Sequence, residues 1–148
     1  MSKYRVLQLT NLNIGAVGID EFLPFGNVTR KISSGNNCCQ TFSVTTTGAD
    51  TIVLNEPGNY RIVYSASLIA EAAGEIGVAL IANGNQVYAV DASAGGAGVV
   101  MNLTLPYEVR VCPNSCAVPN NCPMTIQIKL TGVAATAGTS NILVEKVY

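Results

Sequence analysis

The side chains best suited to chemistry in this sequence are its five cysteines, because none of the 148 residues is a histidine. Histidine is the commonest general base near neutral pH and a common metal ligand, so its absence excludes Ser-His-Asp and Cys-His catalytic arrangements. The carboxylates form no pair in a motif that suggests acid–base catalysis, and Asp20-Glu21 lies beside an expected turn, where we expect it to be solvated. We therefore expect no catalytic residue, and the chain is not predicted to be an enzyme.

The cysteines form two groups in the sequence. Two are adjacent, and three lie in a loop rich in proline and asparagine: Cys38 and Cys39, then Cys112, Cys116 and Cys122. Three interpretations stay open. Disulfides would restrict the unfolded states of the irregular loop, free thiols would simply pack, and a zinc site would need a fourth ligand from the first pair. Disulfides or free thiols are favoured over a metal, so the sequence predicts neither a metal nor another cofactor.

Charged residues are scarce in this chain. They make up 11% of it, whereas 49% of the residues are hydrophobic. An average soluble protein has roughly 25% charged residues, and a disordered chain needs low hydrophobicity and high charge, so disorder is excluded. A monomer so poor in charge would expose much uncharged surface, and such surface usually marks a contact. The composition therefore favours an assembly.

The charge and hydropathy patterns argue against two classes of partner. The net charge is −1 and the basic residues are scattered, so no basic stripe is available for the phosphates of a nucleic acid. No window reaches the roughly 18 uninterrupted apolar residues of a membrane helix. The first residues show no secretory signal. We expect a chain made in the cytoplasm of its host, with no nucleic-acid or membrane partner.

Apolar residues at a spacing of two predict strands from residue 23 onward. The clearest series consists of Tyr60, Ile62, Tyr64, Ala66 and Leu68. Further strands are expected at residues 25–32, 41–47, 51–54, 86–90, 99–105, 107–111, 124–130 and 142–147. Pro106 is expected to end one of these strands, and residues 132–139 are expected to form a loop of small residues. The aromatic side chains Phe42, Tyr60 and Tyr64 are expected in the core.

Residues 65–82 also fit a helix, because apolar residues recur there every four positions. Two glycines inside that stretch would each cost a helix interior roughly 1 kcal/mol relative to alanine. The dipeptide Asn83-Gly84 follows, and it is the strongest short-range signal for a β-hairpin. We therefore predict two strands here. About nine or ten short strands with regular turns predict an all-β antiparallel sandwich or jelly roll.

The leading residues differ from the rest of the chain. Around Tyr4 to Leu9 the alternation is weak, and Asn and Gly residues that favour turns follow. We predict that residues 1–36 form an N-terminal extended arm or attachment segment and that residues 37–148 form the jelly-roll domain.

From residue 41 onward the order of several short motifs resembles the C-terminal domain of the collagen-like exosporium glycoproteins of bacterial spores. The motifs are Phe42-Ser-Val44, Asp50-Thr-Ile-Val-Leu54, Glu56-Pro-Gly-Asn-Tyr-Arg-Ile62, Asn83-Gly84, Gly138-Thr-Ser140 and Ile142-Leu-Val-Glu-Lys-Val147. Those domains look like the jelly rolls of the tumour-necrosis-factor (TNF) and complement type, which assemble as tight trimers. Similar domains occur in head fibres and other surface proteins of phage virions.

The sequence departs from the spore proteins in one respect that affects the expected function. No collagen-like Gly-X-Y segment precedes the domain, which shifts the expectation from a spore to a virion. The resemblance then implies a homotrimeric, non-enzymatic phage virion protein on the capsid exterior, whose partner is the major capsid protein or another particle surface protein. A spore exosporium or coat domain and a receptor- or glycan-binding tip of a phage fibre are the alternatives.

Overall fold

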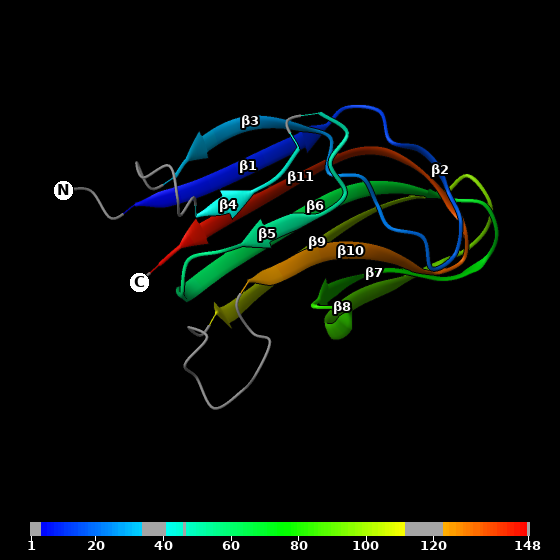
Figure 1. The fold of residues 1–148 in the computed structure, drawn as a ribbon. Coiled ribbons are helices and arrows are strands. Elements are labelled where there is room, and N and C mark those ends of the chain that lie inside the picture. Colours follow the sequence, from blue (N-terminus) through cyan, green and yellow to red (C-terminus); the bar gives the residue numbers. More distant parts are fainter. Residues whose placement is uncertain (1–3, 34–40, 46, 112–122, 148) are drawn as a thin grey trace.

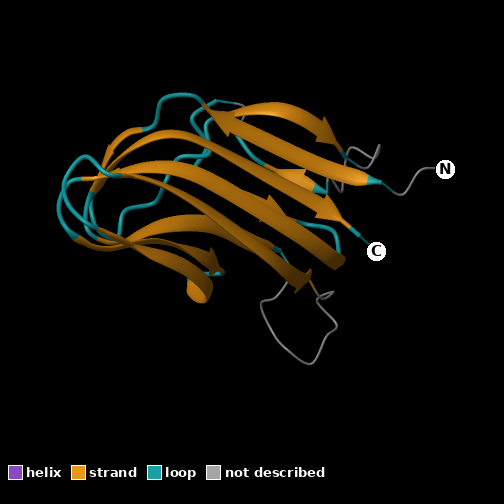
Figure 2. Cartoon of the chain, turned by 180° about the vertical axis from the view of Figure 1, so that it is seen from behind, coloured by secondary structure: helices purple, strands orange, loops and turns teal. Residues whose placement is uncertain are grey.

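The computed structural model describes residues 4–33, 41–45, 47–111 and 123–147. Figure 2 shows these residues as strands and connecting loops that form a sandwich of two antiparallel sheets. The predicted all-β jelly-roll sandwich is confirmed, with eleven strands among the described residues rather than nine or ten. Within the described ranges, no helix has the length and apolar character needed to cross a membrane.

Five strands make up the main path of the larger sheet. Their order is β3 (Asn27–Ile32), β1 (Arg5–Asn11), β11 (Ala135–Lys146), β6 (Gly58–Ala70) and β9 (Val100–Val111). The short strand β2 (Gly15–Val17) pairs with the beginning of β11. Because Arg5 pairs with Lys146, β1 begins where β11 ends, and Figure 1 shows both at the same end of the sandwich.

The smaller sheet also has five strands. Their order is β4 (Phe42–Ser43), β5 (Ile52–Leu54), β10 (Met124–Gly132), β7 (Gly74–Ala82) and β8 (Asn85–Ala94). The edge strands are therefore β3 and β9 in the larger sheet, and β4 and β8 in the smaller one.

The core lies between the two sheets, and alternate side chains of β6 point into it. The five apolar residues predicted to alternate in this strand are each 5% exposed or less. Phe25 packs edge-on against Tyr64, with 6.2 Å between ring centroids, and Phe42 packs in the same way against Tyr60 at 6.1 Å. The predicted core position of the aromatic side chains is confirmed.

The segment that fitted both a helix and strands forms strands. β6 ends at Ala70, and β7 begins at Gly74 after a short turn. β7 and β8 are joined by Asn83 and Gly84, whose positive φ angles of 50° and 80° are those of a tight hairpin turn. The side-chain Oδ1 of Asn83 also accepts a hydrogen bond of 2.8 Å from the backbone N–H of Thr125, which ties the turn to β10.

The prediction that Pro106 ends a strand is wrong, because β9 continues through it. Among the described strands β9 pairs with β6 alone and is therefore an edge strand, and Pro106 lies opposite Val63. Alternate amides of an edge strand point away from the sheet, so proline is tolerated at such a position. The two strands expected at residues 99–105 and 107–111 are therefore one.

Two other predicted boundaries differ from the structure. The loop expected at residues 132–139 is mostly strand, since β11 begins at Ala135 and continues past a register shift between Ala137 and Ser140. Ala135 and Ala137 are buried in β11. The sequence did not predict this part of the strand, because alanine is only weakly hydrophobic. Of the described residues 41–45 and 47 in the strand expected at residues 41–47, only Phe42 and Ser43 are paired in a strand, with β5.

The structure places the leading segment inside the sandwich. β1 pairs with β11 on one side and with β3 on the other, and Leu7 and Leu9 are fully buried. Val6 is buried on the opposite face, which weakened the alternation in the sequence. Over residues 4–33, the segment expected as an arm therefore contributes strands to the larger sheet. The predicted boundary between residues 36 and 37 lies outside the described residues and stays a prediction.

Candidate assembly surface

Side chains on the outer face of the larger sheet form rows across its strands, because residues paired in register share a face. One row crosses all five strands of the main path and consists only of uncharged polar residues. From β3 to β9 this polar row is Asn27, Thr10, Asn141, Ser65 and Thr104.

The sheet is hollowed along the polar row. A depression of about 420 Å³, which we call the polar hollow, has no charged residue in its lining. The polar residues that line it are Thr10, Ser65, Ser67, Asn102, Thr104, Thr139, Ser140 and Asn141. A second depression of about 530 Å³ adjoins it at Thr10 and Leu12 and is lined mainly by asparagine and threonine. The middle of this face therefore offers hydroxyl and amide groups but no charge.

The side chain of Asn141 is held in one orientation. Its Oδ1 accepts a hydrogen bond of 2.9 Å from Gln8 Nε2 and another of 3.0 Å from Thr10 Oγ1. Because both hydrogen bonds go to the oxygen, the Nδ2 group of this amide is left to donate elsewhere. Asn141 is one of the residues that line the polar hollow.

Two further rows lie next to the polar row, toward the end at which β1 begins. The apolar row consists of Leu143, Val63 and Pro106, which lie opposite one another on β11, β6 and β9. The charged row beyond it contains Glu145, Arg61 and Glu108. Arg61 and Glu108 form an exposed ion pair with 3.5 Å between Nη2 and Oε1.

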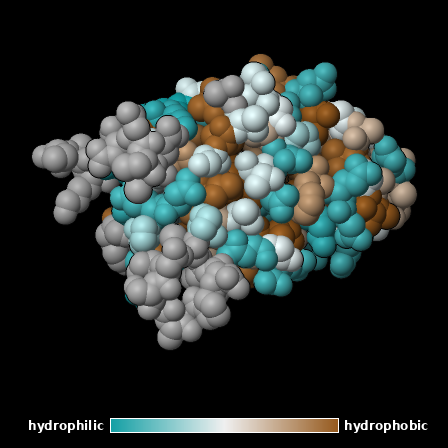
Figure 3. Space-filling model, in the orientation of Figure 1, coloured by the Kyte–Doolittle hydropathy of each residue, from teal (hydrophilic) through white to brown (hydrophobic). Residues whose placement is uncertain are grey.

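The sandwich is closed by aromatic side chains where β8 and β9 face each other. Tyr88 of β8 stacks on Tyr107 of β9, with 5.3 Å between centroids and 21° between ring planes. Val87, Tyr88 and Val100 are nevertheless 39%, 40% and 55% exposed. We call this border, defined by Val87, Tyr88, Val100 and Tyr107, the aromatic edge. The view in Figure 3 likewise shows hydrophobic residues reaching the surface in patches between hydrophilic ones.

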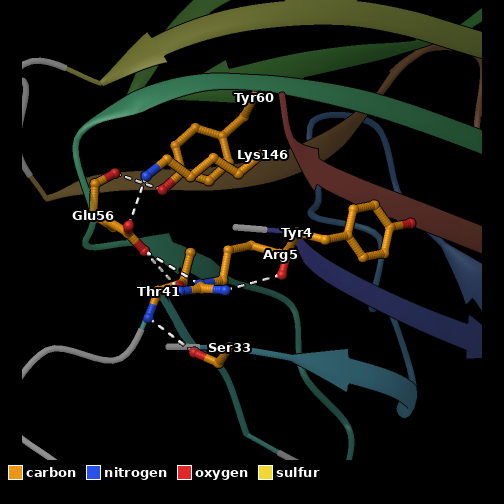
Figure 4. Close-up of polar contacts among 7 residues, drawn as sticks. All are labelled: Tyr4, Arg5, Ser33, Thr41, Glu56, Tyr60 and Lys146. Atoms are coloured by element: carbon orange, nitrogen blue, oxygen red, sulfur yellow. Dashed lines mark hydrogen bonds and ion pairs between the residues drawn. The ribbon is translucent and has the colours of Figure 1, made fainter. Parts of the chain in front are cut away.

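A carboxylate holds together the end of the sandwich where β1 begins (Figure 4). Glu56 Oε1 accepts a hydrogen bond of 2.6 Å from Lys146 Nζ, and Oε2 accepts one of 2.7 Å from Thr41 Oγ1. Arg5 Nε lies 3.8 Å from Oε2. The Tyr60 hydroxyl donates a hydrogen bond to the backbone carbonyl of Glu56. The Glu56 cluster, made of these five residues, therefore links β1, β6, β11 and the segment before β4.

The Glu56 carboxyl stays ionised because of its neighbours. Partial burial raises its pKa, but the hydrogen bonds from Lys146 and Thr41 and the positive charges of Lys146 and Arg5 outweigh burial, so the pKa is lowered from 4.5. A carboxylate that accepts two hydrogen bonds and lies beside a second cation suits a structural role better than catalysis. Elsewhere, burial raises the pKa of Tyr64 above its usual range, so this core hydroxyl stays protonated.

The structure leaves the predicted cysteine chemistry untested. All five cysteines, Cys38, Cys39, Cys112, Cys116 and Cys122, lie outside the described residues. Their pairing as disulfides, their state as free thiols and the disfavoured metal site remain predictions. Among the residues that are described, no group of three or more Asp, Glu, Cys or His side chains is placed to hold a metal ion.

The sequence analysis did not identify the polar row. Its local signal was present, because polar residues alternate in separate strands, as in Ser65 and Ser67 of β6 or Asn102 and Thr104 of β9. Such alternation is typical of any solvent-facing strand. Only the pairing of β3, β1, β11, β6 and β9 brings these residues into one row, and pairing between distant strands cannot be read from one sequence.

Comparisons with known proteins identify the fold. No family model and no curated protein matches the chain. Among solved structures, murine APRIL has a TM-score of 0.63 at 14% identity, covering 97% of this chain and 99% of that one. The fold is that of the TNF-type jelly roll. The Eiger TNF of S. frugiperda has a TM-score of 0.64 at 11% identity over 98% of this chain and 92% of its own.

A third solved structure belongs to a phage. The PRD1 vertex protein P5 has a TM-score of 0.56 at 13% identity, covering 97% of each chain. The predicted resemblance to TNF-type jelly rolls and to a phage surface protein is therefore confirmed at the level of fold. At these identities the likeness concerns the fold alone.

Proposed function

We propose that the chain is a non-enzymatic phage virion protein that assembles as a homotrimer and decorates the exterior of the capsid. The observation that carries this proposal is the outer face of the larger sheet, where the apolar and polar rows place no charge across the middle of the sheet. A free monomer would leave the apolar row and the aromatic edge in water, and exposed apolar area of this kind usually marks a protein contact.

The two apolar surfaces of the chain suit a ring of copies. The aromatic edge lies at one border of the sandwich, and the apolar row of Leu143, Val63 and Pro106 lies on the sheet face. Because the two surfaces differ, packing the edge of one copy on the face of the next is a head-to-tail contact, which closes into a ring when the rotation permits. The trimer implied by the resemblance to TNF-type jelly rolls is such a ring.

The site on a virion is supported by the fold and by the phage neighbour. A protein described as a vertex protein shares the fold over 97% of this chain. The low charge and the absence of a catalytic histidine in the sequence also suit a structural protein. The partner on the particle is then the major capsid protein or another surface protein.

The predicted attachment to the particle is assigned here to β3, a strand of the leading segment. β1 is paired on both sides, so it is not available as a free arm. β3 is an edge strand whose residues are exposed apart from half-buried Val28, and it carries Arg30 and Lys31. We propose that the particle contacts β3.

Antibody labelling of purified particles in the electron microscope tests the location directly. We expect label on the capsid exterior. Label confined to the tail-fibre tip would favour a receptor- or glycan-binding protein, and label on a spore surface would favour the exosporium alternative; either result contradicts the proposal.

Co-sedimentation with capsids that lack the protein tests the attachment. We expect the double variant Arg30→Glu, Lys31→Glu to lose at least tenfold in capsid affinity while its oligomeric mass is unchanged. The matched control is Glu71→Lys, Glu75→Lys, two exposed charge reversals around the β6–β7 turn at the opposite end of the sandwich. Equal binding by both variants would rule out β3 as the contact.

A further inference from the structure

The turn between β7 and β8 holds two groups that can react with each other, Asn83 and Gly84, and both residues are exposed. The side-chain amide carbon of an asparagine can be attacked by the backbone nitrogen of the residue that follows it. The attack meets least hindrance when that residue is glycine, because glycine has no Cβ beside the nitrogen. The hairpin turn is therefore also a candidate modification site.

The modification would be a deamidation in two steps. The Gly84 nitrogen forms a bond to Asn83 Cγ, the Cγ–Nδ2 bond breaks, and Nδ2 leaves as ammonia together with the proton of the Gly84 N–H. Water then opens the resulting five-membered succinimide at either of its carbonyl carbons. One opening gives an aspartate, and the other gives an isoaspartate, whose main chain runs through Cβ and Cγ and is one carbon longer. Both products carry a carboxylate in place of the amide.

The backbone of the folded turn opposes this ring closure. The φ angles of Asn83 and Gly84 are 50° and 80°, which are left-handed values typical of a type I′ turn. In the left-handed conformation ψ is about +47°, and the nitrogen of the next residue then lies nearly opposite Cβ. The succinimide needs Cβ and that nitrogen on the same side of the Cα–C bond. The ring can therefore close only after the turn has changed its conformation.

β10 holds the same residue by three hydrogen bonds. Asn83 Oδ1 accepts bonds of 2.8 Å from the Thr125 backbone N–H and of 3.3 Å from the Thr125 hydroxyl. The Asn83 backbone N–H donates to the Thr125 carbonyl at 3.0 Å. Both the reacting amide and the backbone of Asn83 are thus tied to one residue of a central strand, and ring closure has to overcome these bonds.

We propose that Asn83 is a site of spontaneous deamidation, which the folded hairpin suppresses and which local opening of the β7–β8 edge permits. β8 is an edge strand among the described residues, and local opening of that edge frees the turn. An isoaspartate formed there lengthens the main chain and does not fit the two-residue turn. Tyr88 of the aromatic edge lies on β8, so the modified chain also loses the geometry of that edge. The inference does not rest on the proposed trimer.

Peptide mapping by mass spectrometry during incubation at pH 8 and 37 °C measures the conversion. We expect Asn83 to deamidate at least tenfold more slowly in the folded chain than in the chain unfolded by guanidinium chloride, where both aspartate and isoaspartate should form. In guanidinium chloride, Gly84→Ala should slow the reaction at least fivefold, because its methyl group hinders the attacking nitrogen. Direct hydrolysis of the amide by water would not respond to this substitution.

Thr125→Val tests the contribution of β10 in the folded chain, because it removes the hydroxyl and keeps the backbone N–H. The matched control is Thr131→Val, the same change on the same strand but opposite Gly77. We expect Thr125→Val to deamidate at least twice as fast as wild type and Thr131→Val to be unchanged, with the fold of both verified by circular dichroism.

Equal rates in the folded and unfolded wild-type chain would overturn the inference, and so would an Asn83 that stays intact in guanidinium chloride. An unchanged rate in Thr125→Val would contradict the part assigned to the Thr125 hydroxyl. A monomeric wild-type chain would refute the proposed function without affecting these rates.

Discussion

At the scale of single residues, Glu56 is the group on which polar contacts from separate parts of the chain converge. Lys146 and Arg5, its two cationic partners, have side chains only 16% and 18% exposed, and they come from the last and the first long strands. Partly buried cations need a counter-charge, because burial removes their hydration. Glu56 supplies it and thereby fixes β1 and β11 to the β5–β6 corner.

Replacing Glu56 by glutamine removes the counter-charge but retains an acceptor for Thr41. We expect Glu56→Gln to lower the free energy of unfolding by about 2 kcal/mol, since two half-buried cations lose their partner. Urea denaturation measures the loss. The control is Glu108→Gln, which removes the exposed pair with Arg61 and should cost under about 1 kcal/mol. Equal losses in the two variants would show that Glu56 is an ordinary surface charge.

The contribution of Glu56 should also depend on pH with a definite sign. Its pKa is lowered in the folded chain, so the folded state favours the ionised form relative to the unfolded state. That stability is fully present above pH 4.5 and is lost as the pH falls through the lowered folded pKa. The difference in unfolding free energy between wild type and Glu56→Gln should therefore shrink below about pH 4.5. A difference that grows on acidification would contradict this assignment.

At the scale of elements, local sequence patterns predicted individual strands, but they did not predict which strands pair. The strict alternation in β6 and the Asn83-Gly84 turn identified the central strand and the β7–β8 hairpin correctly, because both signals are local. Pro106 and the small residues before Ser140 were misread, because the tolerance for a proline or a bulge depends on the neighbouring strand. The place of β1 between β3 and β11 also depends on pairing over more than a hundred residues, which a local pattern does not contain.

The position of Pro106 predicts a contrast between two neighbouring strands. Val63 lies opposite it on β6, a central strand that pairs with both β11 and β9. Val63→Pro should destabilise the chain by at least about 3 kcal/mol, because every amide of a central strand bonds to one neighbour or the other. Pro106→Ala should change stability by no more than about 1 kcal/mol.

Thermal or urea unfolding of both variants measures this contrast. A folded Val63→Pro variant of near wild-type stability would contradict the central position of β6. A large loss in Pro106→Ala would contradict the edge position of β9.

At the scale of the whole molecule, the proposed assembly explains both the scarcity of charged residues and the uncharged rows on the outer face of the larger sheet. Only 11% of the residues are charged, and the described structure places none of them in the polar or apolar rows. The composition predicted an assembly before any surface was known. It did not predict the polar row or the aromatic edge, because each is made by strands far apart in the sequence. Whether the five cysteines form disulfides or stay free thiols remains a prediction, because all five lie outside the described residues.

The molar mass of the purified chain in solution tests the central claim most directly. Light scattering coupled to size exclusion should give three times the 15.4 kDa of one chain over a wide range of concentration. Such a mass follows if the aromatic edge of each copy packs on the sheet face of the next. A mass of 15.4 kDa at every concentration would show that these surfaces stay exposed, and it would contradict the account.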